Sequence, residues 1–489
     1  MNPLLILFLF FSYFLLIFLI SHFTSKNATS SDFFNANKSS PWYIVAFGMI
    51  GTSLSGVTFI SVPGEVGNSS FSYFQIVLGY LLGYFVIATI LMPLYYKLNL
   101  VSIYTYLDKR FGFFSYKTGS FFFLLSRIIG SSFRLFLVAS VLQIIFFDSL
   151  NIPFFISVFI TISLIWVYTY KGGIKTIVWT DTLQTFFMLS AVVITILLIM
   201  NEMDLNFSKA KDIIISSSYS DVFVFEWKNE RFFFKQFFSG AFIAIVMTGL
   251  DQDMMQKNLT CKNLNDAQKN IFWFCIVLLF ANILFLTLGA LLHLYADFIE
   301  MPLPSRTDNL YPLIAINHLS IFGSIVFLLG IIAAAYSSAD SALTSLTTAF
   351  CIDFLNFEKR NDIQKKSVRL KVHFLFSVII FFVIQIFSLI NDESVINAIF
   401  KAAGYTYGPL LGLFSFGILT NYNIIDRYSP IICFASPILS FIINIYSESL
   451  FFGYRFGFEI LLLNGLITFV GLFLISLKEN NSIKNEKLK

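Results

Sequence analysis

The sequence contains few of the charged residues that keep a soluble protein in water. Only 12% of its 489 residues are charged, whereas 57% are hydrophobic and Phe alone occurs 63 times. A soluble domain cannot hide so much apolar surface, so the composition predicts an all-α protein that crosses a membrane many times. The net charge is only +4, and we expect the lipid bilayer, not nucleic acid, to be its surroundings.

Cysteine and histidine are equally scarce, with four residues of each type. The cysteines stand singly in or beside apolar segments, at Cys261, Cys275, Cys351 and Cys433. Isolated cysteines of this kind are usually structural thiols, and no pair of residues has the spacing of metal ligands. The sequence also shows no Cys–His or Ser–His–Asp constellation and no nucleotide-binding loop, so we expect no enzymatic activity.

Long apolar runs are the dominant feature. A membrane-spanning helix needs about 20 apolar residues, and thirteen segments meet that requirement. They lie at about 3–20, 42–62, 73–96, 118–147, 152–170, 177–200, 234–250, 270–296, 320–351, 372–390, 395–419, 428–447 and 456–477. No Lys or Arg precedes the first run, which is unlike a signal peptide, so we expect a retained helix.

The basic residues predict an orientation. If the N-terminus lies outside, most Lys and Arg fall in loops on the inner side, such as 97–117 and 353–371. The longest outer loop, 201–233, carries both signs of charge. We therefore expect a plasma (inner) membrane protein with an outer N-terminus and a short cytoplasmic tail at 478–489.

Residues 51–67, GTSLSGVTFISVPGEVG, interrupt the second apolar run with glycine, proline and hydroxyl side chains. Lipid offers the backbone no hydrogen bonds, so a broken helix must face protein or a watery cavity, where its free carbonyls can bind an ion. We expect Gly51 and Gly56 to permit the bend. Close helix packing through the small residues Gly51 and Ser55 is the alternative, and this segment alone leaves both open.

A second polar stretch occupies the ninth run, at 331–354, IIAAAYSSADSALTSLTTAFCIDF. An aspartate such as Asp340 costs a few kcal/mol at mid-membrane if it meets lipid, so it should face a cavity, a cation or a proton path. Sodium is a hard cation that binds oxygen ligands, which hydroxyls and carbonyls supply. Two such segments favour an ion-coupled transporter.

Five motifs occur in the order found in a known family. They are GTSLSGVTFISVPG, the TD and Q of VWTDTLQTFFM, DQDMMQK, AAAYSSADSALTSLTTAFCID and GYTYGPLLG. Over about residues 40–420 the chain resembles the sodium:solute symporter family. The resemblance implies a LeuT-like fold of two inverted five-helix repeats, with one extra N-terminal and two extra C-terminal helices. The implied parts are 1–40 (extra helix and inner loop), 41–200 (first half), 201–233 (outer loop), 234–420 (second half) and 421–489 (C-terminal helices and tail).

The resemblance also implies ion sites. The main sodium site would use carbonyls of Gly51, Leu54 and Ala334 with the hydroxyls of Ser337 and Ser338. A second cation site, present in some members, would use Asp181, Ser337, Asp340 and Ser341. Members with two sodium ions carry serine at the place of Asp340, so a second ion, a proton, or a charge that tunes the first site stay open. Alternatively, Asp181 has no part in ion coupling and only forms hydrogen bonds with the ends of neighbouring helices.

Substrate should lie beside the break, against Ser53, Ser55 and Thr58, with Phe71 and Gln75 one turn apart on the third span. Family members for proline carry an aspartate where this chain has Ser53, which argues against proline.

Two arginines, Arg127 and Arg134, lie seven residues apart on one face of the fourth span. An arginine inside a membrane is expensive and usually paired, and its fork of donors suits a carboxylate. Family members for sialic acid resemble this arrangement. A structural bridge from Arg134 to Asp181 or Asp340 is the alternative.

We therefore expect a sodium-driven symporter, with Na+ as coupling ion, that imports a small organic solute by alternating access. A carboxylate-bearing, sialic-acid-like solute is favoured, and a neutral or zwitterionic one, such as a sugar or an amino acid, is the alternative. A channel or a transporter-like sensor would be a different class, but broken helices argue against a continuous pore and no signalling domain is appended. We infer no obligate protein partner.

Overall fold

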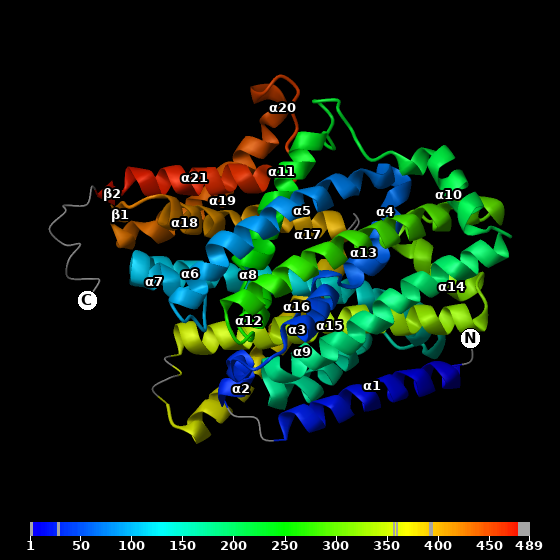
Figure 1. Ribbon diagram of the computed structural model, residues 1–489, viewed down its shortest axis with the longest axis horizontal. Helices are drawn as coiled ribbons and strands as arrows, with labels where there is room; N and C mark the ends of the chain where they lie inside the picture. The colour runs from blue at the N-terminus through cyan, green and yellow to red at the C-terminus, as the bar shows by residue number, and fades with distance from the viewer. Residues whose placement is uncertain (1–2, 27–29, 356, 358–359, 391–394, 478–489) are drawn as a thin grey trace.

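The molecule is a bundle of long helices that run side by side (Figure 1). The computed structural model describes residues 3–26, 30–355, 357, 360–390 and 395–477, so the expected tail at 478–489 lies outside the described residues. Within that part, two short strands, β1 (Asn423–Ile424) and β2 (Ser476–Leu477), pair antiparallel. The prediction of an all-α membrane fold is confirmed.

The N-terminal half of the bundle begins with α1 and continues to a long interrupted helix, α9. Its helices are α1 (Pro3–Ser25), α2 (Ser30–Asn35), α3 (Trp42–Ser53), α4 (Gly56–Ser69), α5 (Phe74–Val86), α6 (Met92–Lys97), α7 (Thr105–Arg110), α8 (Phe113–Leu142) and α9 (Phe154–Glu202). A π-helical turn, Ile87–Leu91, joins α5 to α6. Gly173 interrupts α9 with a φ of 54°, so the runs predicted at 152–170 and 177–200 meet there.

The C-terminal half starts after a loop that contains α10 (Phe207–Ser216). Its helices are α11 (Phe233–Ala244), α12 (Gln252–Asn258), α13 (Leu264–Phe298), α14 (Leu310–Asn317), α15 (Ile321–Phe354), α16 (Asp362–Ile390), α17 (Val395–Thr406), α18 (Gly408–Leu419), α19 (Ser429–Ile445), α20 (Ser447–Leu450) and α21 (Ile460–Leu474). A π-helical turn, Ile245–Gly249, extends α11.

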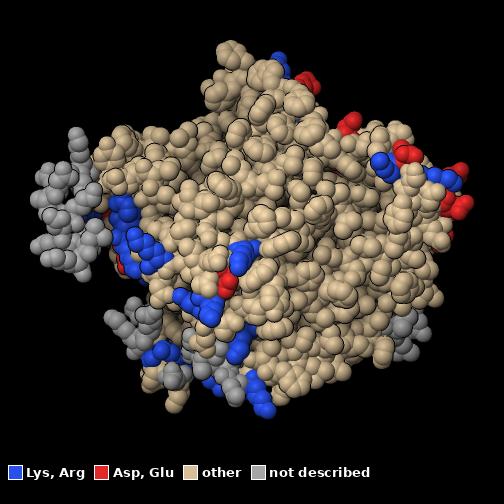
Figure 2. All heavy atoms as spheres, viewed as in Figure 1, with Lys and Arg blue, Asp and Glu red and all other residues tan. Residues whose placement is uncertain are grey.

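The surface fits a lipid environment. Large apolar side chains such as Phe8, Phe159 and Phe382 are more than half exposed. In the described part, eight helices are long and apolar enough to cross a membrane, or ten if each of two bent pairs counts as one span. The total of thirteen spans stays a prediction. On the face in Figure 2, Lys and Arg gather toward the end of the bundle that carries the C-terminus, and mixed charges lie at the opposite end.

Two helices are broken at related places in the two halves. The first break separates α3 from α4 at Leu54 and Ser55, where Leu54 has φ −85° and ψ 72°. The second separates the end of α11 from α12, and the axis bends there by 68°. Broken first helices in both repeats are typical of inverted-repeat transporters. The polar ninth run, in contrast, forms the unbroken helix α15, whose residues 330–349 are all buried.

The glycines near the first break have a different role from the one expected. Gly51 lies within α3 and Gly56 starts α4, and neither has a positive φ, so the bend falls on Leu54 and Ser55. A Cβ atom at Gly51 would collide with Thr185 of α9. The helix is therefore broken, as one interpretation predicted, while Gly51 serves the close packing that the other predicted.

Candidate ion and substrate site

The first break meets α15 through a side chain that the sequence singled out. Ser337 Oγ donates a hydrogen bond to the Gly51 carbonyl at 2.9 Å and lies 3.4 Å from the Ala334 carbonyl. Because α3 ends at Ser53, the Gly51 carbonyl is available for a partner on another helix. Ser338 follows on the same buried helix, and its Oγ donates to the Ala335 carbonyl at 3.2 Å.

The oxygens at this contact fit sodium. They are neutral carbonyls and hydroxyls, which a hard monovalent cation prefers to nitrogen or sulfur. The structure brings together Gly51, Ala334 and Ser337 by hydrogen bonds, and Leu54 lies at the break itself. Their burial means that a bound ion would exchange its water shell for protein oxygens.

A lysine occupies the neighbourhood of Asp181. Lys257, on α12 just after the second break, forms an ion pair with Asp181 and contacts the Thr52 hydroxyl. Thr52 Oγ1 lies 3.0 Å from Asp181 Oδ2. The side chain of Lys257 is only 1% exposed. Sequence reasoning missed this residue, although a lysine closing the DQDMMQK motif beside an apolar run is itself a signal.

The other members of the predicted second cation site have partners of their own. The Asp340 carboxylate accepts hydrogen bonds from Tyr168 Oη at 2.9 Å and from the backbone N–H of Ser341 at 2.6 Å. The Ser341 hydroxyl donates to Asp253 Oδ1 at 2.6 Å. The structure therefore does not gather Asp181, Asp340 and Ser341 around one point by hydrogen bonds.

Arg127 belongs to a buried network at the second break. It forms an ion pair with Asp253, and its Nη1 lies 3.9 Å from Asp251 Oδ2. Tyr407, between α17 and α18, donates a hydrogen bond of 2.5 Å to Asp251. Removing one partner of a buried ion pair strongly destabilises the folded protein. This network therefore holds α8, α12 and the α17–α18 turn together.

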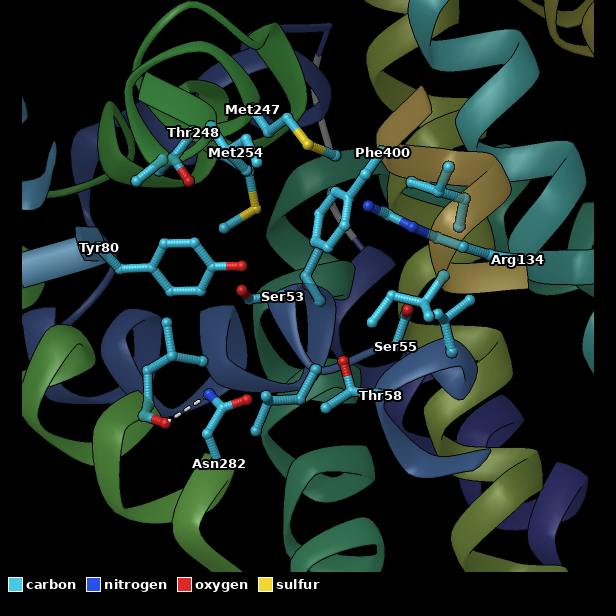
Figure 3. A pocket seen from close by; sticks show the side chains of 18 of the residues that line it. Ser53, Ser55, Thr58, Tyr80, Arg134, Met247, Thr248, Met254, Asn282 and Phe400 are labelled. Carbon is cyan, nitrogen blue, oxygen red and sulfur yellow. Dashed lines mark hydrogen bonds between the residues drawn. The ribbon is translucent and has the colours of Figure 1, made fainter. Parts of the chain in front are cut away.

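Beside the first break lies a small polar cavity (Figure 3). The predicted residues Ser53, Ser55, Thr58 and Arg134 all line it. In Figure 3 the Arg134 side chain extends from α8 toward the ring of Phe400. The further lining residues that sequence reasoning did not name include Tyr80, Met247, Thr248 and Asn282.

Arg134 forms no ion pair within 4 Å in the described part of the chain, although it interacts electrostatically with Asp251. The alternative bridge to Asp181 or Asp340 is not formed, because Asp181 pairs with Lys257 and Asp340 with Tyr168. Arg134 as a whole residue is half-buried, and it lines the cavity with its fork of donors.

Phe71 and Gln75 were predicted to contact substrate, but the structure places both outside the cavity lining. The Gln75 amide instead donates to the Arg231 carbonyl at 3.0 Å and accepts from the Val224 N–H at 3.1 Å, which holds the loop before α11. Phe71 lies in a 3₁₀ turn, Ser70–Tyr73, before α5, and Gln75 lies outside the face of α5 that meets the cavity. Tyrosines at positions 73, 80 and 84 lie there instead.

The paired helix breaks, the oxygen-lined contact with α15 and the polar cavity beside it define an ion-coupled secondary transporter with a LeuT-like fold. The sequence matches the sodium:solute symporter family over residues 33–422, and the chain belongs to that family. It is accordingly an integral membrane transporter that couples a small solute to sodium, and not an enzyme.

Several known proteins are similar to the chain. The sodium/sialic acid symporter NanT of Aliivibrio fischeri is 24% identical over 427 residues, 82% of this chain and 80% of that protein. The sodium/sialic acid symporter SiaT of Proteus mirabilis is 24% identical over 431 residues, 82% and 81%. The sodium-coupled monocarboxylate transporter 1 of Xenopus laevis is 24% identical over 414 residues, 80% of this chain and 63% of that protein.

The fold is also that of a solved structure, a Na+-coupled sialic acid symporter in a substrate-bound outward-open state. The two superpose with a TM-score of 0.82 over 96% of this chain and 97% of the other, at 20% identity. The expected LeuT-like architecture is confirmed.

Proposed function

We propose that the protein imports a carboxylate-bearing solute of the sialic-acid kind, together with sodium, across the plasma membrane. The observation that carries the proposal is Arg134, which lines the cavity and forms no ion pair within 4 Å among the described residues. A planar guanidinium offers two parallel hydrogen bonds that match a carboxylate. The relatives point the same way, since sialic acids and monocarboxylates both carry this group.

The remaining lining residues suit a hydroxyl-rich body attached to that carboxylate. Ser53, Ser55, Thr58 and Tyr80 present hydroxyl groups that can donate and accept hydrogen bonds. Phe400 adds an apolar surface on the side of Arg134. A neutral solute would leave the guanidinium desolvated and unpaired, which is costly, so the anion fits better.

Sodium would be held between α3 and α15 by carbonyls of Gly51, Leu54 and Ala334 and by the hydroxyls of Ser337 and Ser338. An ion there joins the broken helix to the unbroken one. It favours the conformation in which the ligands on both helices can reach it. By linkage, sodium raises the affinity for solute and solute raises the affinity for sodium by the same factor. The membrane potential adds about 2.3 kcal/mol per charge per 100 mV to inward transport.

In this proposal the two halves of the core are residues 41–200 and 234–420, flanked by 1–40 and 421–489. The N-terminus and the loop 201–233 lie outside, and the C-terminus lies in the cytoplasm. The gathering of Lys and Arg at the C-terminal end of the bundle supports this orientation (Figure 2).

A ligand screen on the purified protein tests the substrate class. Melting temperatures would be compared for N-acetylneuraminic acid, its methyl ester, lactate, glucose and proline, each with sodium chloride or choline chloride. The account predicts that the free acid stabilises the protein only with sodium, and that the uncharged methyl ester does not. Equal stabilisation by acid and ester would reject the carboxylate and favour a neutral solute.

A further inference from the structure

Lys257 is a fully buried lysine inside the transport core. It lies on α12, directly after the second helix break, and its side chain is 1% exposed. Lysine is almost never buried to this degree unless an acidic group compensates its charge. Its position therefore indicates a specific electrostatic role.

The ammonium group reaches the place where a second cation would be expected. It forms an ion pair with Asp181 and contacts Thr52 on the first broken helix. It also interacts electrostatically with Asp340 on α15. A positive charge that belongs to the chain thus contacts Asp181 and acts electrostatically on Asp340, the two carboxylates predicted to hold that ion.

The oxygens at this place do not fit a second sodium ion. Asp181 Oδ2 is bonded to Lys257 and Thr52, and the Ser341 hydroxyl is bonded to Asp253. Asp181 Oδ1 has no hydrogen-bond partner among the described residues, but a single oxygen does not make a coordination shell. An ammonium this close would also repel a sodium ion strongly in a medium of low dielectric constant.

Charge balance gives the same result. When both are ionised, Asp181 and Asp340 carry two negative charges, and Lys257 compensates one of them. The main sodium site has only neutral ligands and lies one helical turn from Asp340, because Ser337 and Asp340 are three residues apart on α15. A single sodium ion there brings the whole group to neutrality, whereas a second ion would leave an excess positive charge in the membrane.

We propose that the Lys257 ammonium is a tethered cation that takes the place of a second sodium ion, so that the transporter binds and couples one sodium ion per solute. This inference rests on the proposed sodium-coupled function. It gives Lys257 and Asp340 a joint role. The fixed ammonium of Lys257 balances the charge of Asp181, and the carboxylate of Asp340 balances the single sodium ion, whose own ligands are neutral.

The test is the sodium-binding stoichiometry of the purified protein, measured by equilibrium binding of 22Na+ and by the sodium dependence of the melting temperature. The wild type should bind one ion per chain without cooperativity. The double variant Lys257→Met with Asp340→Ser removes the ammonium and its extra carboxylate together, and it should bind two. Lys262→Met, which changes an exposed lysine in the loop after α12, is the control and should still bind one.

Two ions bound by the wild type would overturn the inference and leave sodium coupling intact. A folded double variant that still binds one ion would assign Lys257 a structural role only, and it would overturn the inference too. No sodium binding by the folded wild type would reject the proposed sodium site itself. If the double variant does not fold, the wild-type count decides.

Discussion

Ser337 on the unbroken helix α15 donates a 2.9 Å hydrogen bond to the Gly51 carbonyl at the end of the broken helix α3. These residues are 286 positions apart in the chain. Their contact joins the two halves of the core at the place where sodium is proposed to bind. A change in this contact should therefore alter ion binding before it alters folding.

Ser338→Ala should weaken sodium binding. Its hydroxyl is a proposed ligand, and alanine fits a buried helix without strain, so stability without sodium should change little. We expect the half-saturating sodium concentration in transport to rise about tenfold, the effect of losing ~1.4 kcal/mol. Ser345→Ala removes a buried hydroxyl of the same helix that bonds the Ala342 carbonyl, and it should leave sodium dependence unchanged. Equal effects of both changes would contradict the assignment.

Gly56→Leu should lower the melting temperature and abolish transport. A Cβ atom at Gly56 would lie 2.6 Å from Val138 Cγ2, so a larger side chain must push α4 away from α8. Overpacking of this kind costs about 1–3 kcal/mol. Gly130→Ala is the matched control, because a Cβ atom there meets nothing within 4 Å. Normal transport by Gly56→Leu would show that the α4–α8 contact does not matter.

Arg134→Lys should reduce the affinity for a carboxylate solute while leaving sodium binding without solute nearly intact. Lysine keeps the charge but loses the two-pronged geometry, and a loss of about 1.5–3 kcal/mol corresponds to roughly ten- to a hundredfold. Arg455→Lys changes an exposed arginine and should have no effect. A lower melting temperature without ligand, together with unchanged solute binding, would make Arg134 a structural residue.

Gln75→Ala and Tyr80→Phe distinguish a residue that holds a loop from a residue that lines the cavity. Gln75 holds the loop before α11 through Arg231 and Val224, so its loss should speed proteolysis of that loop without weakening solute binding. Tyr80 lines the cavity, and loss of its hydroxyl should weaken solute binding about fivefold, the effect of ~1 kcal/mol. Limited proteolysis and a binding isotherm measure both. Weaker solute binding by Gln75→Ala would support the sequence-based prediction that Gln75 contacts the substrate.

The sequence allowed prediction of the fold and of the main site because two kinds of signal agreed. Apolar runs located the helices, and polar residues within them showed where helices face one another instead of lipid. Ser53, Ser55, Thr58 and Arg134 line one cavity as expected. Spacing from the helix break placed the three hydroxyl residues, and the position of Arg134 inside the fourth apolar run placed the arginine.

The remaining residues could not be placed from spacing alone. Phe71 falls in a 3₁₀ turn before α5, and the tertiary packing of α5 turns Tyr80 and Tyr84, not Gln75, toward the cavity. The bend needs no positive φ, so it falls on Leu54 and Ser55 and not on a glycine. The ion pair of Lys257 with Asp181 joins residues 76 positions apart, and only the tertiary structure shows that they meet.

Uptake into proteoliposomes tests the central claim most directly. Purified protein would be reconstituted, and radiolabelled N-acetylneuraminic acid uptake would be measured with an inward sodium gradient, with an equal gradient of choline, and with sodium equal on both sides. The account predicts transient accumulation above equilibrium only with the sodium gradient, and its loss in Arg134→Gln. Accumulation that is the same with choline, or sodium-driven uptake that survives in Arg134→Gln, would contradict it.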